Sequence, residues 1–343
     1  MVEYAPVSTA PYAPLVDAFG RQMGDLRISI TDRCNFRCVY CMPEEGLKWL
    51  SNERVLTFEE IARLAQIFVR LGIRGIRLTG GEPTVRKGLP DLIRMLGPLA
   101  EEGLESLSLT TNGFTLREQA RDLAAAGLTR INVSLDSLMR EKFHRITRRD
   151  CLQRVLDGLE ALEQYPSIAP IKVNAVAIRG FTEDEVIPFA ELARRRPYVV
   201  RFIEFMPLDA DGNWRREQVL AGREIYEMIH RWLPLEPVQT VASSTSRVYR
   251  FADGIGEVGF INPVSEPFCS SCDRLRLTAD GQVRTCLFSI DEWDLRGPMR
   301  AGASDADLVS IIRLAVGHKE LKHRINEGPA FQRASRSMSQ IGG

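Results

Sequence analysis

Residues 26–41 read LRISITDRCNFRCVYC. The first part alternates apolar and polar side chains, which predicts a strand over 26–31. Three cysteines, Cys34, Cys38 and Cys41, then follow with the spacing C-x3-C-x2-C. A loop of this spacing can wrap three thiolates around one face of an iron–sulfur cubane and leave the fourth iron without a protein ligand. Zinc needs four ligands, and the first hundred residues hold no further Cys or His.

The same order of strand, turn and amphipathic helix repeats along the following chain. Thr57 with Glu60, and Thr182 with Glu185, form predicted capping boxes at helix starts. Helices between strands imply right-handed crossovers and a parallel sheet, so the predicted fold class is α/β, a partial (β/α)6 barrel. We predict strands over 26–31, 75–79, 106–110, 130–135, 171–178 and 199–205, and helices over 58–71, 89–101, 116–126, 152–164 and 183–194.

A second, smaller region begins where this order stops. Residues 207–216, PLDADGNWRR, carry the Pro, Gly and Asp of a linker or ordered loop. We therefore expect an N-terminal extension over 1–24, to which we assign no role, a barrel over 25–206 and a C-terminal region over 207–343. The C-terminal region is predicted to contain helices over 223–232 and 306–316, and strands over 247–251, 258–261, 275–278 and 282–286.

The C-terminal region holds a second group of three cysteines. Cys269, Cys272 and Cys286 lie in FCSSCDRLRLTADGQVRTC, with the third after a predicted hairpin. From spacing alone, an iron–sulfur site and a zinc knuckle completed by a distant histidine both remain open. The candidate histidines are His230, His318 and His323.

Composition excludes several classes of protein. The chain has 343 residues, 44% of them hydrophobic, and its 45 basic residues equal its 45 acidic ones. It therefore has no overall positive field for a nucleic acid polymer. No apolar run reaches the ~18 residues of a membrane span, and the N-terminus lacks the pattern of a secretory signal. We predict a cytoplasmic protein, in which the remaining cysteine, Cys151, is a free thiol.

The first cysteine stretch resembles the signature of the radical S-adenosylmethionine (SAM) superfamily, including the aromatic Tyr40 before the last cysteine. The sequence TGGEP at 79–83, after the second predicted strand, is similar to the superfamily's loop for the amino group of SAM. Its glycines allow backbone to approach a ligand closely. The resemblance implies a partial (β/α)6 barrel with a [4Fe–4S] cluster and SAM at the carboxyl ends of its strands.

Nearly the whole chain resembles the GTP 3′,8-cyclase family of molybdenum cofactor biosynthesis. This resemblance implies a second [4Fe–4S] cluster, held by the second cysteine group, and GTP as the substrate. SAM would supply a 5′-deoxyadenosyl radical that removes hydrogen from C3′ of the ribose, after which C3′ attacks C8 to give (8S)-3′,8-cyclo-7,8-dihydroguanosine 5′-triphosphate. The motifs are IRLTGGEPTVR (76–86), TTNG (110–113), INVSLDSL (131–138), KVNAV (172–176), RFIEFMP (201–207), FCSSCDRLRLT (268–278) and the terminal Gly342-Gly343.

The resemblance also implies roles for individual residues. Several basic side chains suit a triphosphate, because Arg presents fork-shaped donors to phosphate oxygens, and we expect Arg27, Arg77 and Lys172 at strand ends that face one mouth of the barrel. A packing role remains open for Thr110 and Met206, and a frayed end for the Gly-Gly tail. The implied SAM contacts are Tyr40, Gly81, Ser134 and Met206; the implied GTP contacts are Arg27, Arg77, Thr110, Lys172, Arg274, Leu275 and Arg276; and the implied catalytic residues are Arg274, Arg276, Gly342 and Gly343.

Two other functions remain open from sequence alone. One is a radical SAM enzyme that modifies a peptide, although its auxiliary domain usually carries more than three cysteines. The other is a zinc-binding scaffold without enzymatic activity. The expected partners of the cyclase are an electron donor and the protein that takes its product onward, and the chain itself would be a monomer or homodimer.

Overall fold

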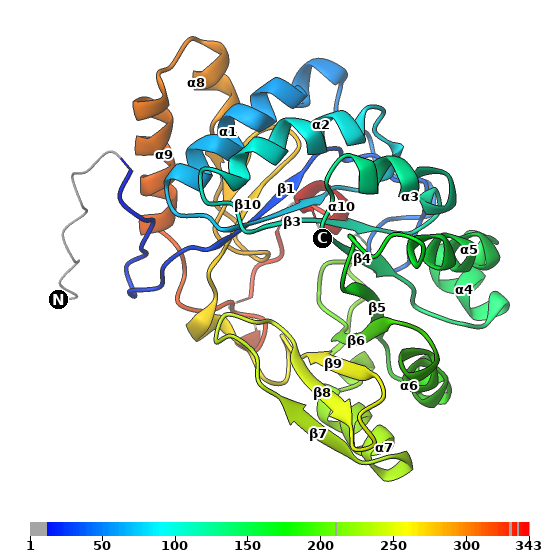
Figure 1. Cartoon of the computed structure of the whole chain (residues 1–343). Helices are drawn as coiled ribbons and strands as arrows, with labels where there is room; N and C mark the ends of the chain where they lie inside the picture. Colours follow the sequence, from blue (N-terminus) through cyan, green and yellow to red (C-terminus); the bar gives the residue numbers. More distant parts are fainter. Residues whose placement is uncertain (1–11, 210, 329–330, 335, 343) are drawn as a thin grey trace.

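The computed structural model describes residues 12–209, 211–328, 331–334 and 336–342. Its strands form one open, curved sheet in the order β12-β11-β10-β1-β2-β3-β4-β5-β6-β9-β8-β7. Figure 1 shows helices along the outside of this arc and the C-terminus on its inner side. The architecture is that of a partial barrel.

The six predicted barrel strands are confirmed, and they pair in parallel in chain order. The strands are β1 (Asp25–Ser29), β2 (Gly75–Thr79), β3 (Ser106–Thr111), β4 (Arg130–Ser134), β5 (Ile171–Ala177) and β6 (Tyr198–Glu204). The helices are α1 (Phe58–Arg70), α2 (Leu89–Leu96), α3 (Leu116–Ala125), α4 (Arg140–Thr147), α5 (Leu152–Leu162) and α6 (Val186–Arg195).

The two faces of these strands differ in polarity. In β1, Leu26 and Ile28 are fully buried in the hydrophobic core beneath the helices. Arg27 lies between them in sequence and therefore points to the opposite, concave face. β2 repeats this pattern with Arg77 between Ile76 and Leu78. The alternation that produces the core thus also places charged side chains inside the barrel.

Some details of the sequence prediction are wrong. The Thr57 and Glu60 capping box forms, but Thr182 makes no capping bond and α6 begins only after Glu185. The Glu185 carboxylate instead accepts from Ser137 Oγ at 2.8 Å and from Leu138 N at 2.6 Å. Glu185 therefore binds Ser137 and Leu138 in the tertiary structure and does not cap its own helix.

The residues after β6 extend the sheet at both edges. β10 pairs in parallel with β1, and β9 pairs in parallel with β6, while the outermost strands are antiparallel. The elements are α7 (Gly222–Trp232), β7 (Leu235–Val238), β8 (Arg247–Phe251), β9 (Glu257–Ile261), β10 (Arg274–Leu277), β11 (Gln282–Arg284), β12 (Trp293–Asp294), α8 (Arg296–Arg300), α9 (Asp305–Gly317) and α10 (Met338–Ile341).

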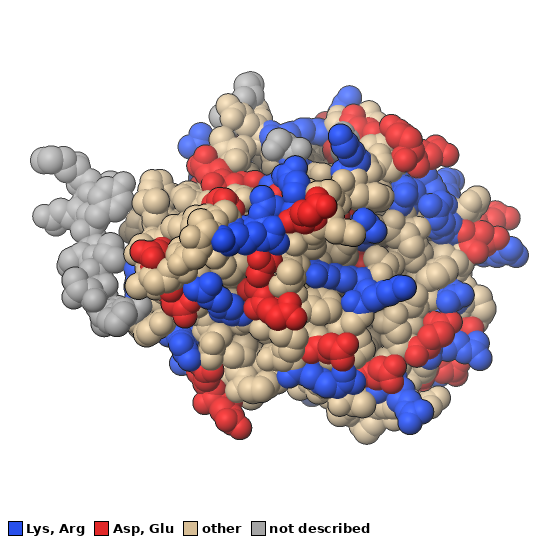
Figure 2. All heavy atoms as spheres, turned by 90° about the horizontal axis from the view of Figure 1, so that it is seen from above, with Lys and Arg blue, Asp and Glu red and all other residues tan. Residues whose placement is uncertain are grey.

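Acidic and basic side chains alternate over the face of the molecule in Figure 2 and form no large patch of one sign there. This agrees with a net charge of zero. None of the helices within the described residues has the length and apolar character needed to cross a membrane. The concentrated positive charge lies inside the barrel instead.

Candidate functional site

The first cysteine group lies in the loop after β1, at the carboxyl end of the parallel strands. All three thiols are free and only partly exposed. Burial raises the pKa of Cys34 and of Cys41 to about 12, and it also raises the pKa of Cys38, where the charges of Asp136, Cys34 and Cys41 add to it. The three sulfur atoms are thus close enough to repel one another when ionised. Uncompensated thiolates are costly here, and a bound cationic group would offset that cost.

The TGGEP loop packs directly on the backbone that precedes the first cysteine. Gly81 N donates to Thr31 O at 2.7 Å, and Glu82 N donates to Arg33 O at 2.8 Å. A Cβ on Gly81 would lie 2.5 Å from the carbonyl oxygens of Asp32 and Arg33. Glycine is therefore needed for this loop and the cysteine loop to meet.

Glu82 joins this loop to the next strand and was not predicted as a site residue. Its side chain is buried, and Oε1 accepts from Thr84 Oγ1 and Thr111 Oγ1, both at 2.6 Å. Oε2 accepts from Asn112 N at 2.6 Å. The available sequence signal was an acidic residue three positions after a buried strand, inside a quoted motif.

Glu82→Gln is expected to lower the free energy of unfolding by ~1–3 kcal/mol, because its new NH2 group would face the Asn112 N–H donor. Urea unfolding of the apoprotein measures this loss. Glu118→Gln is the control, since Glu118 is a half-exposed side chain that pairs with Arg154. Equal midpoints for the two variants would show that Glu82 does not anchor the loop.

The other residues assigned to SAM lie around the same end of the barrel. Tyr40 Oη donates to Asp136 Oδ2 at 2.6 Å, while Val176 N donates to Asp136 Oδ1 at 2.9 Å. Burial raises the pKa of Asp136 to about 6. Ser134 ends β4, and half-buried Met206 follows β6. Asp136, which lies in a quoted motif, is a further residue that sequence reasoning missed.

Basic residues from neighbouring strands form a band across the concave face. Arg276 of β10 pairs in register with Arg27 of β1, which pairs in register with Arg77 of β2. Lys172 and Arg201 continue the band on β5 and β6. Arg27 and Arg77 are the central residues of their strands, so the expectation that they lie at strand ends is wrong.

These cationic side chains lie close together, and several of their nitrogen atoms have no hydrogen-bond partner. The Nε atoms of Arg27, Arg77 and Arg274 are buried without a hydrogen-bond partner, as is Arg274 Nη2. Burial lowers the pKa of Lys172 to about 8, with neighbouring arginines adding to the effect. Burial and the charge of Arg77 lower the pKa of Arg201 to about 9. Such a band fits a small polyanion that supplies acceptors and opposite charge.

Arg201, also missed by sequence reasoning, is fixed in place by amides. Its Nε donates to Asn174 Oδ1 at 2.9 Å and its Nη2 donates to Asn132 Oδ1 at 2.6 Å. Thr110 Oγ1 in turn accepts from Asn132 Nδ2 at 3.3 Å. Leu275 is different, because its side chain is fully buried in the hydrophobic core on the other face of β10. A nucleotide could contact Leu275 only through its backbone.

The second cysteine group adjoins this band. Cys269 lies in a short 3₁₀ turn, Cys272 precedes β10, and Cys286 follows β11. Lys319 Nζ lies 3.9 Å from Cys272 Sγ. Burial raises the pKa of Cys272, but Lys319 and Arg274 more than offset this effect and leave the pKa below its usual value. At Cys272 the surroundings thus favour a thiolate, the form that binds a metal, whereas burial raises the pKa of Cys269 and of Cys286.

The histidines considered as zinc ligands have different surroundings. His230 accepts from Leu235 N at 3.0 Å, and His318 packs on Trp293. The His323 ring packs on Phe288 beside the second cysteine group, with both ring nitrogens unpartnered. In the part of the chain that the structure describes, no three Cys, His, Asp or Glu side chains converge as ligands of one metal ion.

The C-terminal tail lies on the inner side of the barrel and contacts Arg276 of β10. Arg276 Nη1 donates to the carbonyl oxygen of Gly342. A Cβ on Gly342 would lie 2.5 Å from Thr79 Oγ1 and 3.1 Å from the Cβ of Ser29. Gly342 is therefore seated at the ends of β1 and β2, and Gly343 lies outside the described residues.

Comparisons with known proteins identify the family and the fold of this chain. The family described as "Radical SAM superfamily" matches residues 28–193, and "Molybdenum Cofactor Synthesis C" matches residues 198–325. The Streptococcus suis protein SuiB has a similar crystal structure, with a TM-score of 0.59 and 12% identity. That match covers 78% of this chain but only 62% of SuiB, and at such low identity it shows the fold alone.

Curated relatives are similar over almost their entire length. A protein of Rhodopirellula baltica named GTP 3′,8-cyclase is 46% identical over 345 residues, which cover 99% of this chain and 95% of that protein. A protein of Moorella thermoacetica with the same name is 46% identical over 328 residues, which cover 95% of this chain and 99% of that protein. The predicted radical SAM fold and the predicted family are confirmed.

Proposed function

Because this chain belongs to the GTP 3′,8-cyclase family of radical SAM enzymes, we propose that it converts GTP to (8S)-3′,8-cyclo-7,8-dihydroguanosine 5′-triphosphate, the first step of molybdenum cofactor biosynthesis. The family uses SAM and [4Fe–4S] clusters. When bound and reduced by one electron, the first cluster with SAM supplies a 5′-deoxyadenosyl radical. The protein itself binds the substrate and orients it.

The two cysteine groups have the ligand types for these clusters. Cys34, Cys38 and Cys41 would hold the first cluster, and each group offers three thiols, which leaves one iron open for SAM or substrate. Phe36 N donates to Cys34 Sγ at 3.4 Å, and such bonds stabilise a thiolate. The second group, Cys269, Cys272 and Cys286, would hold the other cluster beside the band of cations.

GTP would lie across the concave face of the sheet. The observation that supports this most directly is the set of buried, unpartnered guanidinium nitrogens of Arg27, Arg77 and Arg274. Phosphate oxygens would satisfy them, with Lys172 and Arg276 adding charge. The tail would then close the site, because residues with no side chain can occupy the space between Thr79 and the substrate.

Anaerobic turnover tests the proposed reaction. Reconstituted, reduced protein is incubated with SAM and GTP, and both 5′-deoxyadenosine and the cyclised nucleotide are measured. We expect the two products in equal amounts when GTP is present. Formation of 5′-deoxyadenosine without any nucleotide product would overturn the cyclase assignment.

Lys172 makes GTP binding depend on pH. Burial lowers the pKa of Lys172 to about 8, so the free protein loses this charge as the pH rises through that value. The triphosphate restores the charged form, so GTP affinity is expected to fall roughly tenfold from about pH 7 to about pH 9. Calorimetry on the reconstituted protein measures this change. Lys172→Met should bind GTP more weakly but abolish the dependence, whereas exposed Lys87→Met should retain it. A flat wild-type profile would contradict the role.

The remaining partners follow from the reaction. We propose a one-electron donor, a separate protein that takes the cyclised nucleotide onward, a cytoplasmic location, and a monomer or homodimer. A peptide substrate is not favoured. SuiB has been crystallised with a precursor peptide, but it resembles this chain in fold alone. A zinc scaffold is not favoured either, given relatives named as GTP 3′,8-cyclases at 46% identity.

A further inference from the structure

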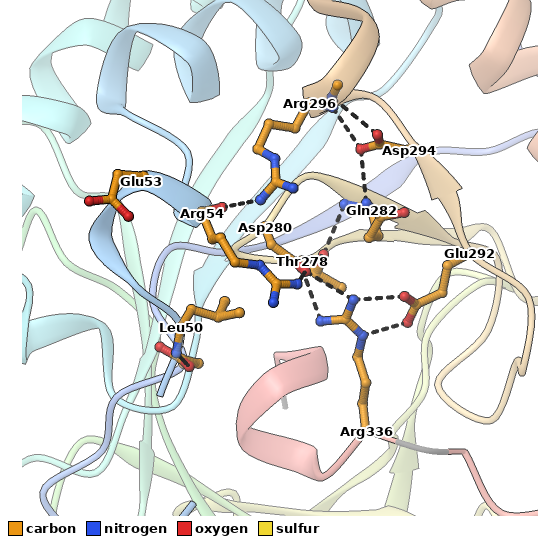
Figure 3. A network of polar contacts seen from close by, with 12 residues as sticks. Leu50, Glu53, Arg54, Thr278, Asp280, Gln282, Glu292, Asp294, Arg296 and Arg336 are labelled. Carbon is orange, nitrogen blue, oxygen red and sulfur yellow. Dashed lines mark hydrogen bonds and ion pairs between the residues drawn. The ribbon is translucent and has the colours of Figure 1, made fainter. Parts of the chain in front are cut away.

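One arginine anchors the base of the C-terminal tail. The Arg336 side chain is 18% exposed, and its Nη1 and Nη2 donate to the two carboxylate oxygens of Asp280 at 3.0 and 3.1 Å. Nη2 also donates to Glu292 Oε2 at 2.7 Å. Figure 3 shows the guanidinium group between these two acidic side chains. Bidentate pairs of this kind are geometrically specific and stronger than neutral hydrogen bonds.

Asp280 belongs to the β10–β11 hairpin beside the second cysteine group, and Glu292 lies in the segment that connects Cys286 to β12. Asp280 lies in the turn between β10 and β11, is only 2% exposed, and accepts from Thr278 Oγ1 at 2.7 Å. Glu292 also accepts from Arg284 of β11, whose side chain is 1% exposed. Arg284 lies two residues before Cys286. The anchor therefore connects the tail to the element that presents Arg276 and the second cysteine group.

Beyond this anchor the tail is short and lies inside the barrel. Helix α10 has four residues, ends at fully buried Ile341, and is followed by Gly342 on Arg276. An isolated helix of this length is unstable in water. The tail thus needs tertiary contacts to hold the Gly342 carbonyl in place, and Arg336 supplies a fixed starting point.

We propose that Arg336 is a positioning residue for the cyclisation: its ion pairs with Asp280 and Glu292 latch the C-terminal tail to the second-cluster hairpin and hold Gly342 on Arg276. This proposal rests on the proposed function. Without the latch, the tail would leave its seat, and Arg276 would lose the partner that orients its guanidinium group toward the substrate.

A double-mutant cycle tests the latch in reconstituted protein. Arg336→Met, deletion of residues 342–343, and the combination of both are compared with wild type. We expect Arg336→Met to lower kcat for the nucleotide product at least ~10-fold, with no further loss in the deletion background, because both changes act through the tail. In Arg336→Met, the rate of 5′-deoxyadenosine formation without GTP should stay within ~2-fold of wild type. Independent, multiplying effects, or normal turnover in either single variant, would overturn the proposal.

Two further variants separate positioning from general damage to the fold. Arg336→Lys keeps one charge but not the bidentate geometry, so it should restore part of the lost kcat. Arg324→Met removes a 70% exposed arginine that pairs with Glu327 and should behave as wild type. Hydrogen exchange in residues 337–342 should rise in Arg336→Met with unchanged iron content, and unchanged exchange would overturn the latch. A wild-type protein that forms no cyclised nucleotide would instead refute the proposed function.

Discussion

Cys38→Ser is expected to abolish 5′-deoxyadenosine formation from SAM, with a loss of at least ~1000-fold, because an incomplete ligand set cannot hold the first cluster. Cys38 is the middle residue of the group, and the charges of Cys34 and Cys41 both raise the pKa of its thiol. Reconstituted protein should retain about four of its roughly eight irons. Iron analysis and chromatography of the reaction mixture measure both results.

Cys151→Ser is the matched control for this experiment. Cys151 is a free, partly exposed thiol at the start of α5, apart from both cysteine groups in sequence. The exchange should leave iron content and turnover at wild-type values. If Cys38→Ser behaved like Cys151→Ser, the first group would not be the cluster site.

The sequence was most informative where a regular period was present. Apolar residues of strands such as β1 and β2 pack under helices, so alternation alone located both strands and the direction of Arg27 and Arg77. Helix α4 was missed because it has only eight residues, so its apolar face is a single set of Phe143, Ile146 and Thr147. The pairing of β10 with β1 could not be predicted from the sequence either, since it joins residues far apart in the chain.

Buried acidic residues account for most of what was missed at the site. Glu82, Asp136 and Glu204 each lie inside a motif that was quoted for its family resemblance. Each accepts hydrogen bonds from segments distant in sequence; Glu204 Oε2, for example, accepts from Val264 N and Ser265 N, both at 2.9 Å. Their partners become neighbours only after folding. The motifs therefore combine ligand-binding residues with the residues that hold loops together.

Cys272→Ser should retain the SAM cleavage that Cys38→Ser loses. Cys272 belongs to the second group, next to Lys319 and Arg274 at the start of β10. We propose that this cluster orients the guanine of GTP, so its loss would stop cyclisation while the TGGEP loop around Gly81 stays intact. We expect nucleotide product to fall at least ~1000-fold while 5′-deoxyadenosine formation without GTP stays within ~2-fold of wild type.

Iron content and product analysis together decide whether the two groups act separately. Cys272→Ser should keep about four irons per chain, as should Cys38→Ser, so the variants differ in the reaction they lose and not in the iron they bind. Loss of SAM cleavage in both would mean that the second group also supports the first step. Normal nucleotide product from Cys272→Ser would mean that the substrate is oriented by the cation band alone, with Arg27, Arg77 and Lys172 as its principal contacts.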